Sequence, residues 1–305
     1  MTKKLLFILF IISLFTYSVL SQDKEEDKSP YKSSTFNGLK FRSIGPAVTS
    51  GRITDFAVNP NNIHEYYVAV ACGNVWKTTT SGTTGSQYLT LYGSHSIGCV
   101  TIDPKNTHVV YVGTGENNSQ RSVSWGDGLY RSEDGGKSFS NIGLKKSEHI
   151  AKILIDPRDS KVIYAAAQGP LWGPGGDRGL YKSIDYGATW GFCSLHQPKH
   201  RCYRCCYGSK RPGCNFMRHH TREEGTFWTL LNGGPEGGIH KSTDAGKTWN
   251  KLTNGLPTGD IGRIGLAISP VNPDYIYAII EAAEDKSGFF RTTNRGVTWE
   301  KIERI

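Results

Sequence analysis

An eight-residue pattern with glycine at its fifth position recurs five times along the chain and limits the folds that the sequence can adopt. Its copies are TTTSGTTG (78–85), SEDGGKSF (132–139), SIDYGATW (183–190), STDAGKTW (242–249) and TTNRGVTW (292–299). Successive copies begin 54, 51, 59 and 50 residues apart. Repetition at this interval is typical of proteins built from similar units, because each unit buries its apolar surface against the next.

Strand-like segments surround each copy. An apolar run that ends at a turn, such as IAKILIDP (150–157), is followed by a second run, such as KVIYAAA (161–167), and by a third, such as GLYKS (179–183), that leads into the pattern. Alternating Val, Ile and Tyr indicate strands, and the Asp-Pro and Asn-Pro steps indicate turns. Four antiparallel strands per unit predict an all-β fold, a β-propeller of four-stranded blades, with about five blades present. The apolar residues show no 3.6-residue periodicity, which argues against a helical solenoid.

The repeated pattern itself predicts a tight turn between the third and fourth strands. The aspartates can accept hydrogen bonds from backbone N–H groups within the turn, the glycines permit a positive φ, and the tryptophans are expected to pack between blades. A residue that recurs in every blade has a structural role, so we do not expect these aspartates to be catalytic. The residues concerned are Asp134, Asp185, Asp244, Trp190, Trp249 and Trp299.

The N-terminus predicts export. Lys3 and Lys4 precede an apolar run, Leu5 to Leu20, and small residues precede a cleavage position after Ser21. We therefore predict a signal peptide at 1–21, a disordered polar leader at 22–36 and propeller repeats at 37–305. The apolar run is short for a membrane span, so we expect a secreted, periplasmic or cell-surface protein with no span after cleavage.

The formal net charge of +9 does not indicate a nucleic-acid partner. The signal peptide and residues 191–226 account for all but two of the net positive charges. Because most of the net positive charge lies in these two segments, no extended basic surface is expected on the blades.

Residues 191–226 interrupt the repeat where the first two strands of a blade are due, and we find no usable strand there. The spacing of Cys202, Cys205, Cys214 and His219 resembles a zinc knuckle, and a disulfide cluster is an alternative in an exported protein. A third interpretation comes from the genetic code. Permitted codons for 199–216, read one nucleotide later, give STGVTDVVMDPKDPDVIL, which has the form of the missing strands. We favour a frame-shifted and poorly ordered segment, and we predict no metal and no cofactor.

The strand 2–3 loops and the 4–1 connections share one face of a propeller, and here they are long and rich in chemically useful side chains. An apolar platform beside oriented polar groups is what a sugar or peptide site requires. The candidate ligand-binding residues are Arg52, Asn117, Arg121, Trp125, Trp172, Arg178 and Trp228. The candidate catalytic carboxylates are Glu116, Asp127, Asp177 and Glu236.

Three longer strings identify a resemblance. LKFRSIGPAVTSGRITDFAVNP (39–60), GENNSQRSVSWGDGLYRSEDGGKS (115–138) and AAQGPLWGPGGDRGLYKS (166–183) resemble secreted bacterial proteins of sortilin-type propeller architecture, often labelled glycosyl hydrolase, BNR repeat. The eight-residue pattern resembles their Asp-box. The resemblance covers 37–305 apart from the shifted segment, and it implies a ligand site on the face opposite the Asp-box turns. Because such proteins are usually longer, we expect this chain to be a fragment.

Two function hypotheses follow, and a purely structural scaffold stays open as a third. The first is an exported binding module that holds a peptide or protein on its loop face, as the sortilin resemblance implies. The second is a glycoside hydrolase, xyloglucanase-like or sialidase-like, which needs two carboxylates about 5–9 Å apart across the scissile bond. No local motif selects such a pair among the candidates.

Overall fold

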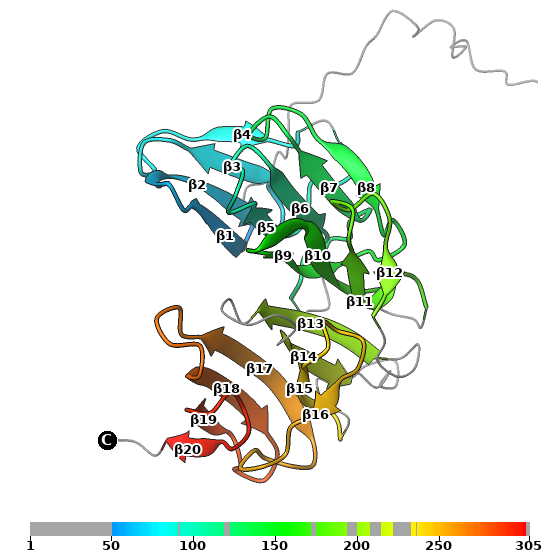
Figure 1. The fold of residues 1–305 in the computed structure, drawn as a ribbon. Helices are drawn as coiled ribbons and strands as arrows, with labels where there is room; N and C mark the ends of the chain where they lie inside the picture. The colour runs from blue at the N-terminus through cyan, green and yellow to red at the C-terminus, as the bar shows by residue number, and fades with distance from the viewer. Residues whose placement is uncertain are drawn as a thin grey trace, which may run out of the picture. The chain divides into compact units, whose positions relative to one another are not determined.

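The computed structural model describes residues 51–90, 92–118, 123–171, 175–193, 200–207, 215–221, 233–235 and 237–302. The predicted signal peptide and leader lie outside these residues. Within the described ranges every regular element is a β-strand (Figure 1). No described segment forms a helix long and apolar enough to cross a membrane.

The strands form five four-stranded antiparallel sheets, each made of four strands consecutive in sequence (Figure 1). The first blade comprises β1 (Ile53–Asn59), β2 (Asn62–Val70), β3 (Val75–Thr78) and β4 (Ser86–Tyr88); the second, β5 (Ile97–Ile102), β6 (Val110–Thr114), β7 (Leu129–Ser132) and β8 (Ser140–Gly143); the third, β9 (Ile150–Asp156), β10 (Asp159–Gln168), β11 (Arg178–Ser183) and β12 (Gly191–Phe192). The fourth comprises β13 (His200–Tyr207), β14 (Asn215–Thr221), β15 (Gly238–Ser242) and β16 (Asn250–Lys251); the fifth, β17 (Ile261–Ile268), β18 (Ile276–Ala282), β19 (Gly288–Thr292) and β20 (Glu300–Ile302). These sheets are blades of a β-propeller, as the repeat predicts.

The turn between the first and second strands of a blade is closed by the residue before proline. Asp103 Oδ1 accepts a hydrogen bond from the backbone N–H of Lys105 at 2.9 Å, and Asn59 Oδ1 accepts one from Asn61 at 2.9 Å. This Asx turn explains why the apolar runs end at Asp-Pro or Asn-Pro steps.

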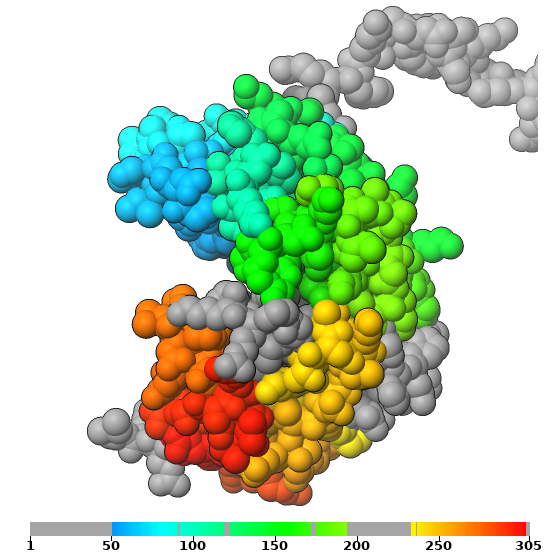
Figure 2. All heavy atoms as spheres, viewed as in Figure 1, coloured from blue at the N-terminus to red at the C-terminus, as the bar shows by residue number. Residues whose placement is uncertain are grey.

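The blades pack face to face, and the cores lie between them. One apolar cluster joins residues of the first and second blades, and another joins residues of the second and third blades. Strand β6 is buried along its whole length because neighbouring sheets cover both of its faces. The first strands of neighbouring blades also contact one another. Figure 2 shows the first two blades, blue to cyan-green, in continuous atomic contact.

The fourth blade corrects one expectation. The sequence predicts no usable strand in 191–226, but β13 and β14 lie there and pair antiparallel from His200–Thr221 to Tyr207–Asn215. Strand β14 in turn pairs with β15, so the two occupy the first and second strand positions of the blade. Strand β13 ends and β14 begins with the same offset that separates the end of β5 from the start of β6. Backbone pairing with β15 therefore completes this sheet even though the segment lacks apolar alternation.

Candidate functional site

The strand 3–4 turns use one hydrogen-bond arrangement. In the second blade, Asp134 Oδ1 accepts from the backbone N–H of Ser138 at 2.9 Å and from Ser132 Oγ at 2.8 Å, while its Oδ2 accepts from Ser138 Oγ at 2.6 Å. Ser132 Oγ accepts from the N–H of Gly136 at 2.8 Å. The turns around Asp185 and Asp244 repeat these contacts through Ser183 and Ser242. In each turn both carboxylate oxygens are engaged locally.

The first and fifth blades form the same turn with other chemistry. Asn294 Oδ1 accepts from the N–H of Thr298 at 2.9 Å, and its Nδ2 donates to Thr298 Oγ1 at 2.8 Å. In the first blade, Thr80 Oγ1 accepts from the N–H of Thr84 at 2.9 Å. The turn therefore requires an acceptor at this position but not a negative charge.

Hydrogen bonding holds the turn carboxylates ionised. Bonds from Ser183 lower the pKa of Asp185 from 3.8 to about 2, with help from Thr189. Bonds from Thr248 lower the pKa of Asp244 to about 2 as well. The pKa of Asp134 is lowered in the same way, first by Ser138. Hydrogen bonds to the charged form are the cause in all three cases.

The aromatic residue at the end of the pattern packs against a neighbouring unit. Trp190 of the third blade donates its indole N–H to the carbonyl of Ile142 in the second blade at 2.8 Å. Trp249 packs beside the third-blade cluster that contains Tyr164 and Leu180, and Trp299 is buried in a cluster with Ile239 of the fourth blade. These contacts lie between blades.

On the opposite, loop-bearing end, an ion pair joins the first two blades. Arg52, just before β1, donates from Nε to Glu116 Oε1 at 2.6 Å, and its Nη2 contacts the same oxygen. Asn118 Nδ2 also donates to Oε1 at 3.0 Å. The Glu116 side chain is fully buried, whereas the Arg52 side chain is 53% exposed. The second carboxylate oxygen, Oε2, is buried with no hydrogen-bond partner.

Asn117 ties the second-blade loop to the third blade. Its side-chain Nδ2 donates to the backbone carbonyls of Gly98 at 2.7 Å and Ala151 at 3.3 Å. The backbone carbonyl of Asn117 accepts from Gln168 Nε2 at 3.0 Å. The two strands to which the Asn117 side chain donates, β5 and β9, are the first strands of their blades. The side-chain amide of Asn117, which the sequence predicts to bind a ligand, therefore donates to the protein backbone.

Trp125 has an anchored backbone and an exposed ring. Its carbonyl accepts from Ser94 Oγ at 3.1 Å, and the next residue, Gly126, donates to the carbonyl of Glu148 at 2.6 Å. The backbone N–H of Glu116 donates to the carbonyl of Ser124 at 3.0 Å, which pairs the two ends of the loop. The Trp125 residue is 73% exposed. The loop thus holds the exposed ring of Trp125 in place, one residue beyond Ser124, whose carbonyl pairs with the backbone N–H of Glu116.

The other described candidates are bound to nearby protein groups. Asp127 Oδ2 accepts from Tyr130 Oη at 2.6 Å, and Asp177 Oδ2 accepts from the N–H of Lys146 at 2.9 Å. Arg178 is buried and donates to the carbonyl of Pro170 at 2.8 Å. Burial raises the pKa of Tyr130, and the bond to Asp127 adds to this. These three side chains hold loops in place.

Four predicted site residues, Arg121, Trp172, Trp228 and Glu236, lie outside the described residues, as do the side chains of the cysteine-rich segment. Among the described residues, no group of three or more His, Cys, Asp and Glu side chains could hold a metal ion. The described cysteines are free thiols: Cys72, Cys99 and Cys193.

Sequence reasoning missed the residues that assemble the loop face. Gln168 is buried at the end of β10 and bonds to the second-blade loop, and Ser96 Oγ donates to the carbonyl of Ser124 at 3.0 Å. A polar residue at the loop end of an otherwise apolar strand, as in YAAAQ (164–168), was the available indication for Gln168.

No protein-family model matches the chain, and no curated protein matches it in sequence. Solved structures do match. The GH74 xyloglucanase from Xanthomonas campestris superposes with a TM-score of 0.61 at 18% identity, covering 82% of this chain and 38% of the enzyme. The Niastella koreensis GH74 enzyme gives 0.60 at 20% identity over the same shares. YCF48, solved bound to D1 peptide, gives 0.53 at 16% identity, over 82% of this chain and 66% of YCF48.

These neighbours are β-propeller proteins, and at such identities the likeness establishes the fold alone. The chain spans well under half the length of the GH74 proteins that it matches. The class of protein that the fold defines is therefore a β-propeller protein.

Proposed function

We propose that this chain is an exported propeller module of sortilin type that binds a peptide or protein segment on its loop face. The loop face consists here of Arg52, the second-blade loop 115–118 and 123–128, and the neighbouring connections. Export rests on the predicted signal peptide. The resemblance of the loop strings to sortilin-type proteins supports the ligand class, and so does YCF48, a fold neighbour solved with a peptide.

One observation carries the choice of binding over hydrolysis. Each described candidate carboxylate is committed to a protein group, Glu116 to Arg52, Asp127 to Tyr130 and Asp177 to the backbone of Lys146. A glycosidase needs one carboxylic acid and one carboxylate facing the bond that breaks. Among the described candidate residues of this face, the exposed groups are instead an indole and a guanidinium, Trp125 and Arg52. An aromatic surface beside a hydrogen-bond donor suits a peptide.

The Arg52–Glu116 pair fits this role because it fixes the guanidinium without covering it. Arg52 uses Nε and Nη2 to hold Glu116, and its side chain stays half exposed. Guanidinium has five N–H donors, so others can meet a backbone carbonyl or a carboxylate. The pair is neutral overall, which favours recognition by shape and hydrogen bonding over long-range attraction.

The hydrolase hypothesis is kept because the GH74 enzymes share the fold. Activity on aryl-glycosides and xyloglucan, lost in both Glu116→Gln and Asp127→Asn, would overturn the binding proposal. Loss in those two variants without loss of folding would assign the carboxylates a catalytic role.

The direct test is binding of an immobilised random peptide library to the purified chain and to Trp125→Ala. We expect the variant to lose affinity by at least about tenfold, since a central interface aromatic typically contributes 2 kcal/mol or more. Ile184→Ala is the matched control, because Ile184 is similarly exposed but lies in a strand 3–4 turn at the other end of its blade. Equal loss in both variants would contradict a site at the loop face.

A further inference from the structure

Glu148 is an acidic residue of the loop face whose carboxylate is not engaged by the protein. It lies in the connection from β8 to β9 and is partly exposed. No group in the described part of the chain forms a hydrogen bond or an ion pair with its carboxylate. The carboxylates of Glu116, Asp127 and Asp177, in contrast, are all held by protein groups. An anionic acceptor is therefore available to a ligand at Glu148.

The backbone of Glu148 is in a left-handed conformation, with φ of 59°. This conformation is less favourable for glutamate than for glycine. Gly259 holds the same place in the fifth blade, two residues before the first strand, and has φ of 95°. Glycine would form the connection with less strain, so the presence of a glutamate calls for a role of its side chain. Contact with a ligand is such a role.

The carbonyl of Glu148 fixes this residue against the loop that carries Trp125. The carbonyl accepts from the backbone N–H of Gly126, the residue after Trp125, at 2.6 Å. A Cβ atom at Gly115 would collide with the same carbonyl oxygen, so both ends of the second-blade loop meet Glu148 backbone to backbone. Trp125 and Glu148 therefore belong to segments in direct contact whose relative position is fixed.

The ring of Trp125 is free to contact a cation. The residue is 73% exposed, and no described lysine or arginine lies over its ring. The rings of Tyr67, Tyr111 and Tyr164 each have such a cation, at 5.0, 5.9 and 5.4 Å from the centroid. Tryptophan is the side chain whose ring face attracts an ammonium or guanidinium group most strongly. Beside an available carboxylate, this ring forms a site for a cation.

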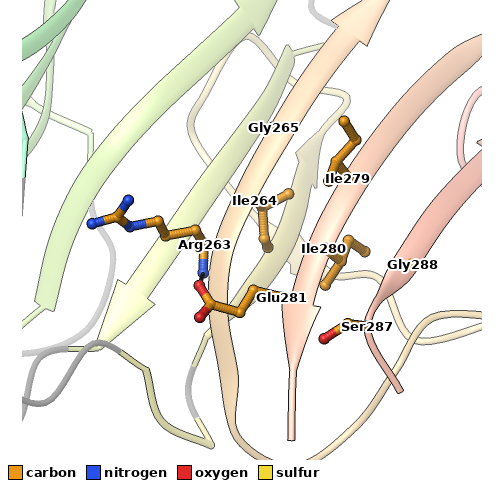
Figure 3. Close-up of a pocket in the computed structure, with 8 residues that line it drawn as sticks. All are labelled: Arg263, Ile264, Gly265, Ile279, Ile280, Glu281, Ser287 and Gly288. Carbon is orange, nitrogen blue, oxygen red and sulfur yellow. Dashed lines mark hydrogen bonds between the residues drawn. The ribbon is translucent and has the colours of Figure 1, made fainter. Parts of the chain in front are cut away.

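A hollow of about 530 Å³ on the fifth blade shows the contrast (Figure 3). Its carboxylate belongs to Glu281, whose Oε2 accepts from the backbone N–H of Arg263 at 3.0 Å. The Arg263 guanidinium points away from this carboxylate, and no aromatic side chain is among the lining residues. The hollow therefore lacks both an available carboxylate and an exposed ring.

We propose that Trp125 and Glu148 bind a lysine or arginine side chain of the peptide that the loop face holds. The cation lies over the indole, and the Glu148 carboxylate accepts from its N–H groups. Arg52, which Glu116 holds at the other side of the loop, donates to the peptide backbone. The assignment rests on the proposed function and names its ligand class, a basic peptide. One available carboxylate is half of the pair that a glycosidase needs.

The first test uses the cation alone and needs no peptide. N-acetyl-argininamide is titrated into the isotope-labelled chain, and the indole N–H signal of Trp125, assigned from Trp125→Phe, is followed by NMR. A saturable shift is expected, and N-acetyl-glutaminamide at the same concentrations should not cause it. Glu148→Gln should weaken the apparent affinity for the arginine compound about fivefold, the effect of an exposed ion pair.

Asp260→Asn is the matched control for the loss of one negative charge. Asp260 is exposed and lies in another connection, directly before β17. Its substitution should leave the arginine titration unchanged. An equal effect of Asp260→Asn and Glu148→Gln would show that net charge alone is responsible and would overturn the proposal. Circular dichroism and thermal unfolding verify that each variant is folded.

Glu148→Gly separates recognition from a structural role. Glycine relieves the left-handed strain, so the melting temperature should rise or stay unchanged. The affinity for N-acetyl-argininamide should nevertheless fall as it does in Glu148→Gln. A lower melting temperature with an unchanged titration would show that Glu148 serves the connection only, and would overturn the proposal.

The immobilised random peptide library then tests the ligand class. Peptides retained by the wild-type chain should be enriched in lysine and arginine over the unselected library, and Glu148→Lys should replace that enrichment by aspartate and glutamate. Retention without basic enrichment, or no shift of the Trp125 signal with N-acetyl-argininamide, overturns this inference and leaves peptide binding standing. Retention of no peptide overturns the proposed function, and the titration then decides the cation site by itself.

Discussion

Tyr67 Oη lies 2.7 Å from the carbonyl oxygen of Gly135 and donates to it across the interface of the first two blades. The same turn is held internally by Asp134 and Ser132. The repeated pattern therefore forms the turn between the third and fourth strands of its own blade, and it also presents a backbone carbonyl to the preceding blade. The fourth position varies among Ser, Gly, Tyr, Ala and Arg because only its backbone takes part.

Removing this hydroxyl should weaken the interface. Tyr67→Phe keeps the buried ring and deletes the donor, so we expect a loss of about 0.5–1.5 kcal/mol in the free energy of unfolding. Lys77 still reaches Gly135 O at 3.2 Å, which keeps the loss at the lower end of that range. Chemical denaturation measures the change. Tyr277→Phe is the control, because no described carbonyl accepts from that hydroxyl, and it should stay near wild type; equal losses would show that the ring environment, not the crossing bond, is responsible.

The turn carboxylates should be replaceable by an amide but not by a methyl group. Asp185→Asn reproduces the contacts that Asn294 makes in the fifth blade, so it should leave unfolding at neutral pH nearly unchanged. Asp185→Ala removes the acceptor for the N–H of Thr189 and should lower the melting temperature clearly. The two variants are compared by thermal unfolding. A strong effect of Asp185→Asn would mean that the negative charge itself matters.

The same carboxylates predict acid sensitivity of defined sign. Their pKa values are lowered in the folded state, to about 2 for Asp185 and Asp244 from 3.8. A group with a lowered folded pKa stabilises the protein above its unfolded pKa, and this contribution is lost as pH falls through the folded value. Stability should therefore fall between about pH 4 and pH 2. A variant with asparagine at 134, 185 and 244 should show a shallower pH dependence, measured by denaturation at each pH.

The repeat interval and the turn residues made the fold predictable from the sequence. The roles of single loop residues could not be predicted in this way. Alternating runs closed by Asp-Pro steps specify strands locally, so the blades follow from short-range information. Glu116, Asn117 and Arg178 have the residue types of a ligand site, yet their partners come from other blades or from distant parts of a loop. Whether a polar side chain faces solvent or the backbone of a neighbouring blade depends on packing that no local pattern records.

Close approach of backbones makes Gly98 intolerant of any side chain. A Cβ at this position would lie 2.2 Å from the carbonyl oxygen of Ile150 and 2.5 Å from that of Gly115. Because neither backbone group can move without opening the second and third blades, Gly98→Ala should cost at least about 2 kcal/mol. Gly191→Ala is the control, since its nearest neighbour, the carbonyl oxygen of Lys182, is 3.7 Å away. That variant should be neutral or slightly more stable in denaturation experiments.

The frame-shift hypothesis for 191–226 leads to a prediction about the fourth blade. Replacing 199–216 by STGVTDVVMDPKDPDVIL places an Asp-Pro step directly after the end of β13, as Asp103-Pro104 follows the end of β5. In β13 the replacement changes all three cysteines to Val and Tyr207 to Met, and in β14 it changes only Asn215 and Phe216, to Ile and Leu. These apolar residues suit sheets covered on both faces. We therefore expect a higher melting temperature and no change in the circular dichroism of the strands. A scrambled sequence of the same composition should not produce this gain, because the Asx turn and the alternation would be lost. A lower melting temperature for the replacement, together with one equivalent of zinc bound by the original chain, would contradict the hypothesis and favour the zinc knuckle.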